Sequence, residues 1–195
     1  MAPVTIYFYF SCQKFWARVA PIALTLDEAG VEYEIKDISE APEGCGFAYP
    51  MMSLEDDTRL SQTIAITTHL GEKYGLNGST PLEKTVNLQT MLDFDDMVEE
   101  IPKGVYKKSP ERLQKWLDVF ESRLKDPFFG DEQVATADFM AVFVISIVNQ
   151  LFGKDYFEKC PKLAKWNAAI EEVPVVKKIK DSGVNIMPEE MKSFA

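Results

Sequence analysis

The segment PMMSLEDDTRLSQTIAI spans residues 50–66 and combines the signals of two strands, a turn and a helix start. Met51 to Leu54 predicts a short strand, Asp56-Asp57 a turn, and Arg59-Leu60 the start of a second strand. A helix is expected from Gln62 to about Tyr74, because apolar residues recur there at helical spacing. The segment therefore predicts a strand–turn–strand unit that leads directly into a helix.

The residues before this segment carry strand and helix patterns in turn. Val4 to Phe10 is β-branched and aromatic and is apolar on both faces, which is typical of a strand covered on both sides. Phe15 to Ala29 has an apolar stripe at helical spacing, and Gly30 stands where a helix stop is expected. Val31 to Ile35 alternates and predicts another strand. The strand–helix–strand order predicts a parallel pair with a right-handed crossover.

The rest of the chain is predicted to be helical. Asn77 to Pro81 is a polar, Gly-containing linker. Apolar periodicity and start signals predict four main helices, at Leu82 to Glu100, Ser109 to about Lys125, Thr136 to Leu151 and Pro161 to Val173. The third of these is apolar nearly all round and is expected at the buried centre. The predicted fold class is an α/β unit over residues 1–76 followed by an all-α unit over residues 82–195.

Composition and charge exclude several functional classes. The 195 residues include 21 basic and 31 acidic side chains, and the formal charge of −10 opposes binding to nucleic-acid phosphates or to an anionic membrane surface. The single histidine, His69, argues against a His-based metal site and a Ser-His-Asp triad, so no metal is expected. No apolar run is long enough for a membrane span.

The cysteines indicate the compartment. Cys12, Cys45 and Cys160 are widely spaced and form no CxxC pair, so neither a disulfide framework nor a dithiol redox site is predicted. The odd count suits a reducing environment, and a cytoplasmic protein is expected.

Five segments, in the right order, resemble motifs of the cytosolic glutathione transferases, nearest the sigma-like group. They are residues 50–66, His69 to Leu76, Arg18 to Ile22, Gly130-Asp131 with Thr136 to Phe139, and Pro161 to Leu163 with Val173 to Val176. The resemblance implies a thioredoxin-like, glutathione-binding domain over residues 1–76. It further implies an all-helical domain over residues 82–195 that forms the second-substrate pocket, and a homodimer.

The activity that the resemblance implies is attack by the glutathione thiolate on a small hydrophobic electrophile. Glutathione is then the co-substrate, the reaction is conjugation, peroxide reduction or isomerisation, and the role is detoxification. The second-substrate pocket is expected between the two domains, lined by the loop after the first strand and by the face around Met97, Ile101 and Tyr106.

The resemblance also implies which residues bind glutathione. Tyr49 would pair with the cysteinyl backbone like an added strand, ahead of a cis Pro50, where a trans turn proline is the alternative. Gln62-Thr63, at a helix start, would hold a carboxylate, where a plain Thr N-cap is the alternative. Arg18 belongs to the helix motif. Asp96, or its neighbour Asp95, would reach the γ-glutamyl amine across the dimer, where a solvated acidic face is the alternative.

Four residues are candidates for activating the thiol. Tyr9 and Ser11 stand level, Cys12 follows, and Tyr7 comes last. A hydroxyl would donate a hydrogen bond to the thiolate and lower its pKa. Cys12 would instead form a mixed disulfide, favoured by its place before a helix, which gives a Cys12-dependent glutathione thiol transferase or reductase. Core packing is the alternative for the tyrosines and for Cys12. A further alternative is a non-catalytic binding or structural protein with this fold.

One helix start departs from the family motif. Asp138 fits a buried N-capping motif in which a Ser or Thr normally stands three residues earlier. Ala135 holds that place here, which predicts a weaker cap unless Thr136 substitutes.

Overall fold

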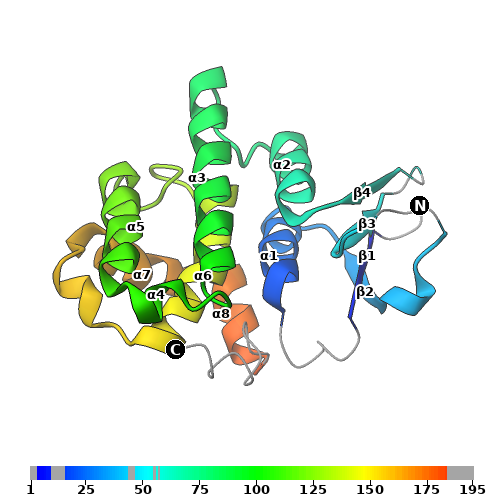
Figure 1. Cartoon of the computed structure of the whole chain (residues 1–195). Coiled ribbons are helices and arrows are strands. Elements are labelled where there is room, and N and C mark those ends of the chain that lie inside the picture. The colour runs from blue at the N-terminus through cyan, green and yellow to red at the C-terminus, as the bar shows by residue number, and fades with distance from the viewer. Residues whose placement is uncertain (1–3, 10–15, 44–46, 55, 57, 184–195) are drawn as a thin grey trace.

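The computed structural model describes residues 4–9, 16–43, 47–54, 56 and 58–183. Its sheet lies on one side, α1 and α2 stand next to it, and the later helices are grouped beyond them (Figure 1). This arrangement confirms the predicted class of an α/β unit followed by a helical one.

The sheet has four strands in the order β2-β1-β3-β4. They are β1 (Val4–Phe8), β2 (Tyr33–Asp37), β3 (Met51–Ser53) and β4 (Arg59–Ser61). β1 and β2 are parallel, as the crossover predicts, whereas β3 is antiparallel to both β1 and β4. All five residues of β1 are buried, which agrees with a strand that is apolar on both faces.

Helix α1 (Ala20–Glu28) is shorter than the predicted helix at its start, and β2 begins later than the predicted strand. Pro21 has no N–H and cannot donate an α-helical bond to Ala17, so residues Ala17–Val19 form a 3₁₀ turn, η2, instead. At the other end, Gly30 has φ +67° and the Val31 N–H donates to Leu26 O over 2.9 Å. Val31 therefore closes the helix rather than opening the strand.

The remaining helices follow in chain order. They are α2 (Thr63–Tyr74), α3 (Pro81–Glu100), α4 (Val105–Lys108), α5 (Pro110–Arg123), α6 (Thr136–Phe152), α7 (Pro161–Glu172) and α8 (Pro174–Asp181), with short 3₁₀ turns at Ile38–Glu40 and Asp155–Glu158. Helix α6 is buried along most of its length, as its sequence predicts. Within the described part of the chain, no helix combines the length and apolar character that crossing a bilayer requires.

The start of α6 is held by side chains from other segments. The buried Asp138 carboxylate accepts hydrogen bonds from the main-chain N–H groups of Phe129 (2.9 Å) and Ala135 (2.8 Å) and from Nε1 of Trp166 (2.8 Å). Thr136 does not take over the capping role. Its hydroxyl donates to Asn77 Oδ1 over 2.6 Å, while the Ala137 N–H donates to Oδ1 of Asn87 on α3 over 3.1 Å. The cap of α6 thus comes from a different helix.

The buried apolar side chains form two clusters, one in the helical part and one between the sheet, α1 and α2. Trp16 and Ala17 pack against both clusters. Helix α1 also contributes Ala20 and Leu24 to the first cluster and Ile22 and Leu26 to the second, so α1 and the short segment before it lie between the two halves of the core.

Candidate functional site

The end of β1, the start of β3 and the end of β4 lie side by side at one end of the sheet. In the β3–β4 hairpin Met51 pairs with Ser61, and Met51 also lies opposite Tyr7 of β1. The residues just beyond these pairs are therefore neighbours: Tyr49-Pro50 before β3, Gln62 after β4 and Tyr9 after β1. The strand register alone brings together segments that lie far apart in the sequence.

Tyr9 and Tyr49 are in contact at this end of the sheet. We call the group formed by Tyr9, Tyr49-Pro50, Gln62 and Thr63 the strand-end site. Their rings lie 5.7 Å apart, edge to face, and the Tyr49-Pro50 bond is cis, as the family resemblance implies. Tyr9 is 48% exposed, whereas Tyr7, inside β1, is only 8% exposed. Of the two tyrosines, Tyr9 is the one whose side chain reaches solvent. Ser11 and Cys12 lie outside the described residues.

Gln62 and Thr63 form the start of α2. Gln62 is the N-cap residue with φ +75°, and its side chain does not cap the helix. Thr63 is the first helical residue, so it is not the N-cap that local sequence would suggest. Its hydroxyl is buried and donates to Arg18 O over 3.1 Å. The side chain of Thr63 thus links α2 to the segment before α1. The first N–H groups of a helix have no acceptor within the helix itself.

Arg18 reaches the helical half of the molecule. Its Nη1 pairs with Oδ1 of Asp95 and its Nη2 with Oε1 of Glu99, both on α3. Asp95 is therefore engaged within its own chain. Asp96, the next residue, is exposed on the outer side of α3.

The predicted second-substrate face is wrong. Met97, Ile101 and Tyr106 are 0%, 1% and 3% exposed and belong to the core of the helical half. The Tyr106 hydroxyl donates to Met97 O over 2.9 Å, and burial raises the pKa of this phenol above its ordinary value. Helical periodicity identified an apolar face of α3 correctly. In the described part of the chain, however, this face packs into the helical core and is withdrawn from solvent.

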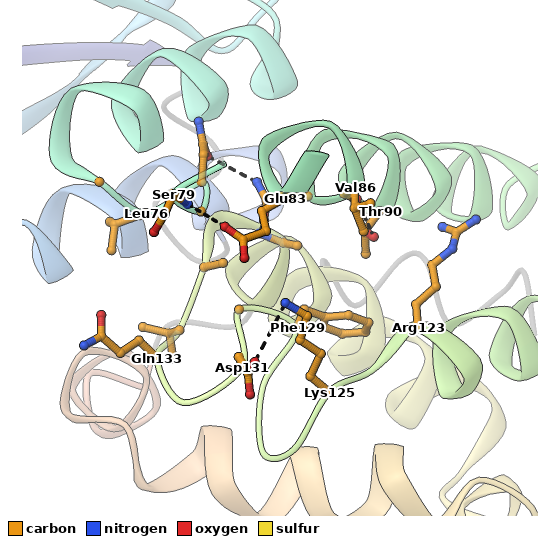
Figure 2. A pocket seen from close by; sticks show the side chains of 18 of the residues that line it. Leu76, Ser79, Glu83, Val86, Thr90, Arg123, Lys125, Phe129, Asp131 and Gln133 are labelled. Atoms are coloured by element: carbon orange, nitrogen blue, oxygen red, sulfur yellow. Dashed lines mark hydrogen bonds and ion pairs between the residues drawn. The ribbon is translucent and has the colours of Figure 1, made fainter. Parts of the chain in front are cut away.

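A cavity of about 310 Å³ lies elsewhere, among the linker 75–79, the first turns of α3 and the loop before α6. Figure 2 shows Glu83 of α3 in its middle, with Lys125 and Phe129 on the facing loop. Glu83 is already engaged, because its carboxylate accepts from the main-chain N–H groups of Ser79 (2.8 Å) and Thr80 (2.9 Å). These bonds hold the pKa of Glu83 below its usual range. Nothing in the sequence patterns indicates this cavity.

Comparison with known proteins supports the resemblance. Residues 91–182 match the family model for the glutathione S-transferase C-terminal domain. The chain is 26% identical to glutathione S-transferase class-mu 26 kDa isozyme 1 of Fasciola hepatica over 187 residues, with 83% of this chain and 81% of the relative covered. The chain is thus similar to the glutathione S-transferases. Glutathione S-transferase Mu 1 of Oryctolagus cuniculus is also 26% identical, over 80% of this chain and 82% of that one.

Solved structures show the same glutathione S-transferase fold. A glutathione transferase homologue from Sulfitobacter, solved with bound glutathione, superposes with a TM-score of 0.71 at 19% identity, over 94% of this chain and 100% of the other. The curated relatives named above are of the mu class, whereas the sequence motifs resemble the sigma-like group. The chain thus resembles glutathione transferases without resembling one class consistently.

Proposed function

We propose that this protein is a glutathione transferase that binds glutathione at the strand-end site and activates its thiol for attack on a small hydrophobic electrophile. The observation that carries the proposal is the convergence of three segments at one end of the sheet, namely Tyr9, Tyr49-Pro50 and the start of α2, in a chain that resembles glutathione transferases. The reaction is conjugation, peroxide reduction or isomerisation, with glutathione as co-substrate.

The chemistry of glutathione fits what lies at this end of the sheet. Its cysteinyl backbone is a short extended segment that can add to main-chain groups at Tyr49, next to β3. A glutathione carboxylate suits the start of α2, where the first N–H groups of a helix and the helix dipole favour a negative charge. In this chain the Thr63 hydroxyl is bonded to Arg18 O, so we assign binding at α2 to main-chain N–H groups rather than to that side chain.

The activating group is one of the residues at the end of β1 or just after it. We propose a hydroxyl, from Tyr9 or Ser11, that donates a hydrogen bond to the thiolate and lowers the thiol pKa. The exposure of Tyr9 at the strand-end site supports its candidacy, and the burial of Tyr7 within β1 counts against that residue. Cys12 stays the alternative, acting as a nucleophile that forms a mixed disulfide with glutathione.

Calorimetry of glutathione binding, paired with a conjugation assay on an aryl halide, tests this function. We expect binding and turnover by the wild type, and a loss of kcat of about a hundredfold in one of Tyr9→Phe and Ser11→Ala. Tyr7→Phe is the matched control, because it removes the same hydroxyl from a buried position inside β1, two residues before Tyr9, and it should keep wild-type kcat.

Two other outcomes would replace this function. Loss of thiol-transfer activity in Cys12→Ala, with glutathione binding retained, would make the protein a Cys12-dependent oxidoreductase. Folded protein with no affinity for glutathione would make it a binding or structural protein with the transferase fold.

We also propose that the protein is a homodimer that works in the cytosol. Large apolar side chains stand in solvent at Phe47, next to the strand-end site, and on the outer side of α3, where Leu82 is 72% exposed and Val86 and Leu92 are also exposed. Apolar side chains that cluster on a surface indicate an interface. The three cysteines without a CxxC pair suit a reducing compartment.

A further inference from the structure

Arg18 lies at the point where three helices meet. It sits in the 3₁₀ turn before α1, its main-chain oxygen accepts the hydroxyl of Thr63 at the start of α2, and its guanidinium reaches α3. The residues on its N-terminal side, Trp16 and Ala17, pack against both core clusters. A single residue thus connects the first turn of α2 with the C-terminal part of α3.

The guanidinium of Arg18 already forms ion pairs with two carboxylates of its own chain. Nη1 and Nη2 each donate to a different carboxylate, those of Asp95 and Glu99. The side chains of Arg18 and Asp95 are 28% and 29% exposed, so both groups are partly withdrawn from water. Lys103 approaches Glu99 at 4.0 Å, but a ligand carboxylate brought to Arg18 would still face the carboxylates of Asp95 and Glu99.

We propose that Arg18 is a positioning residue for glutathione binding and not a ligand of glutathione. Its ion pairs with α3 hold the 3₁₀ turn in place. Because the Thr63 hydroxyl donates to Arg18 O, this turn then positions Thr63 and the first N–H groups of α2. Planar, two-pronged donation to two carboxylates is a geometry that arginine provides and lysine does not. The inference rests on the proposed function, since it explains how the carboxylate-binding end of the strand-end site is held.

A second ion pair on α3 supplies a matched control. Arg123 of α5 pairs with Asp93, and these side chains are 23% and 22% exposed, close to the values of Arg18 and Asp95. This pair joins α3 to α5 rather than to α2. Arg123→Gln therefore removes a comparable ion pair from the same helix without touching the strand-end site.

The test is calorimetric titration of glutathione into the wild type, Arg18→Gln, the double variant Asp95→Asn/Glu99→Gln, the triple variant that combines these changes, and Arg123→Gln. If Arg18 positions α2 through α3, Arg18→Gln and the double variant should each weaken the Kd by about tenfold. The triple variant should be no weaker than either, because the same connection is lost in all three. Arg123→Gln should keep the wild-type Kd within about twofold, and Arg18→Lys should recover affinity only in part.

A direct contact between Arg18 and glutathione predicts the opposite sign for the double variant. Removing two competing carboxylates would then leave the Kd unchanged or tighten it, and Arg18→Gln would weaken binding equally in both backgrounds. Either result overturns the proposal.

Amide hydrogen exchange provides a readout that does not need glutathione. The Ile66 N–H donates to Gln62 O over 3.0 Å and closes the first turn of α2. Arg18→Gln should speed exchange at Ile66, and Arg123→Gln should not; equal rates in the two variants overturn the positioning role. If the wild type binds no glutathione, the proposed function fails, and the exchange result then shows separately whether Arg18 holds the start of α2.

Discussion

Asp138 shows what a single buried carboxylate does in this protein. It accepts hydrogen bonds from main-chain N–H groups and from the Trp166 indole, and these bonds favour its charged form. Complete burial acts more strongly in the other direction and raises the pKa of Asp138 to about 6. The residue therefore binds a proton in the folded protein at pH values where the unfolded chain has already lost it.

We expect Asp138 to make folding more favourable at acidic pH. Its stabilising proton is fully present below about pH 4 and is lost as the pH rises through about 6, a change of about 3 kcal/mol in the free energy of unfolding. Asp138→Asn has no such titration. Urea unfolding of both proteins between pH 4.5 and 7.5 should show the wild type losing stability relative to the variant as pH increases. Parallel pH profiles would contradict this assignment.

Gly71 illustrates a position where helix propensity and packing disagree. In the interior of α2, alanine would be favoured over glycine by about 1 kcal/mol on propensity alone. Here, however, a Cβ would lie 2.0 Å from Asn77 Oδ1 and 2.7 Å from Thr136 Cγ2. Both atoms belong to a buried hydrogen-bonded group and have little room to move.

We therefore expect Gly71→Ala to lower the free energy of unfolding by about 3 kcal/mol, because the new methyl group must displace Asn77. Chemical denaturation measures the effect. Glu72→Ala, at the exposed neighbouring position, should change stability by less than about 1 kcal/mol. A stabilised Gly71→Ala protein would show that Asn77 is free to move away.

At the scale of elements, α6 depends on α3 for its start. Ala135 cannot cap the helix with its side chain, and Thr136 is bonded to Asn77. Asn87 of α3 fills the gap: its Oδ1 accepts the Ala137 N–H over 3.1 Å, and its Nδ2 donates to Thr136 Oγ1 over 2.7 Å. The central helix of the core is therefore completed by tertiary packing and not by its own sequence.

Asn87→Ala should destabilise the fold by about 2–3 kcal/mol, because it leaves buried N–H and hydroxyl groups without their partner. Thermal or urea unfolding is the measurement. Gln89→Ala, at an exposed position of the same helix, is the control and should be close to neutral. If the two variants unfolded alike, the capping role of Asn87 would be refuted.

At the scale of the whole molecule, the proposed homodimer should bury some of the apolar side chains that are exposed in the single chain. Phe47 is fully exposed, as is most of Leu82 on α3. If Phe47 lies in the interface, Phe47→Ser should weaken self-association by at least about tenfold, since a buried aromatic side chain contributes strongly to binding.

Sedimentation velocity over a range of protein concentrations measures this association. Ile35→Ser is the matched control, because Ile35 is also an exposed apolar residue but lies on β2, the strand at the opposite edge of the sheet from β4. A wild type that sediments as a monomer would refute the homodimer. Equal effects of the two substitutions would instead place the interface away from Phe47.

Local patterns predicted most of the elements and the fold class. The start and end of α3, α6 and α7 were predicted to within one residue, because their apolar periodicity and their Pro and Gly signals are properties of contiguous sequence. The misplaced boundaries of α1 and β2 arose where hydrogen bonding at Pro21 and Val31 overrode periodicity. The candidate residues Tyr49, Pro50, Gln62 and Thr63 were identified through motif resemblance, and the strand register places them side by side.

The amino-acid sequence by itself determined the order of the elements, the family resemblance and the absence of basic or His-rich chemistry, because each follows from residue type and spacing along the chain. Tertiary structure alone decided which apolar face of α3 is covered, which residue caps α6 and which carboxylates hold Arg18. Arg18 and Asp95 are 77 positions apart, and Asn87 and Ala137 are 50 apart. Such contacts arise from how helices pack, and packing depends on the shape of both partners, which no local sequence pattern encodes.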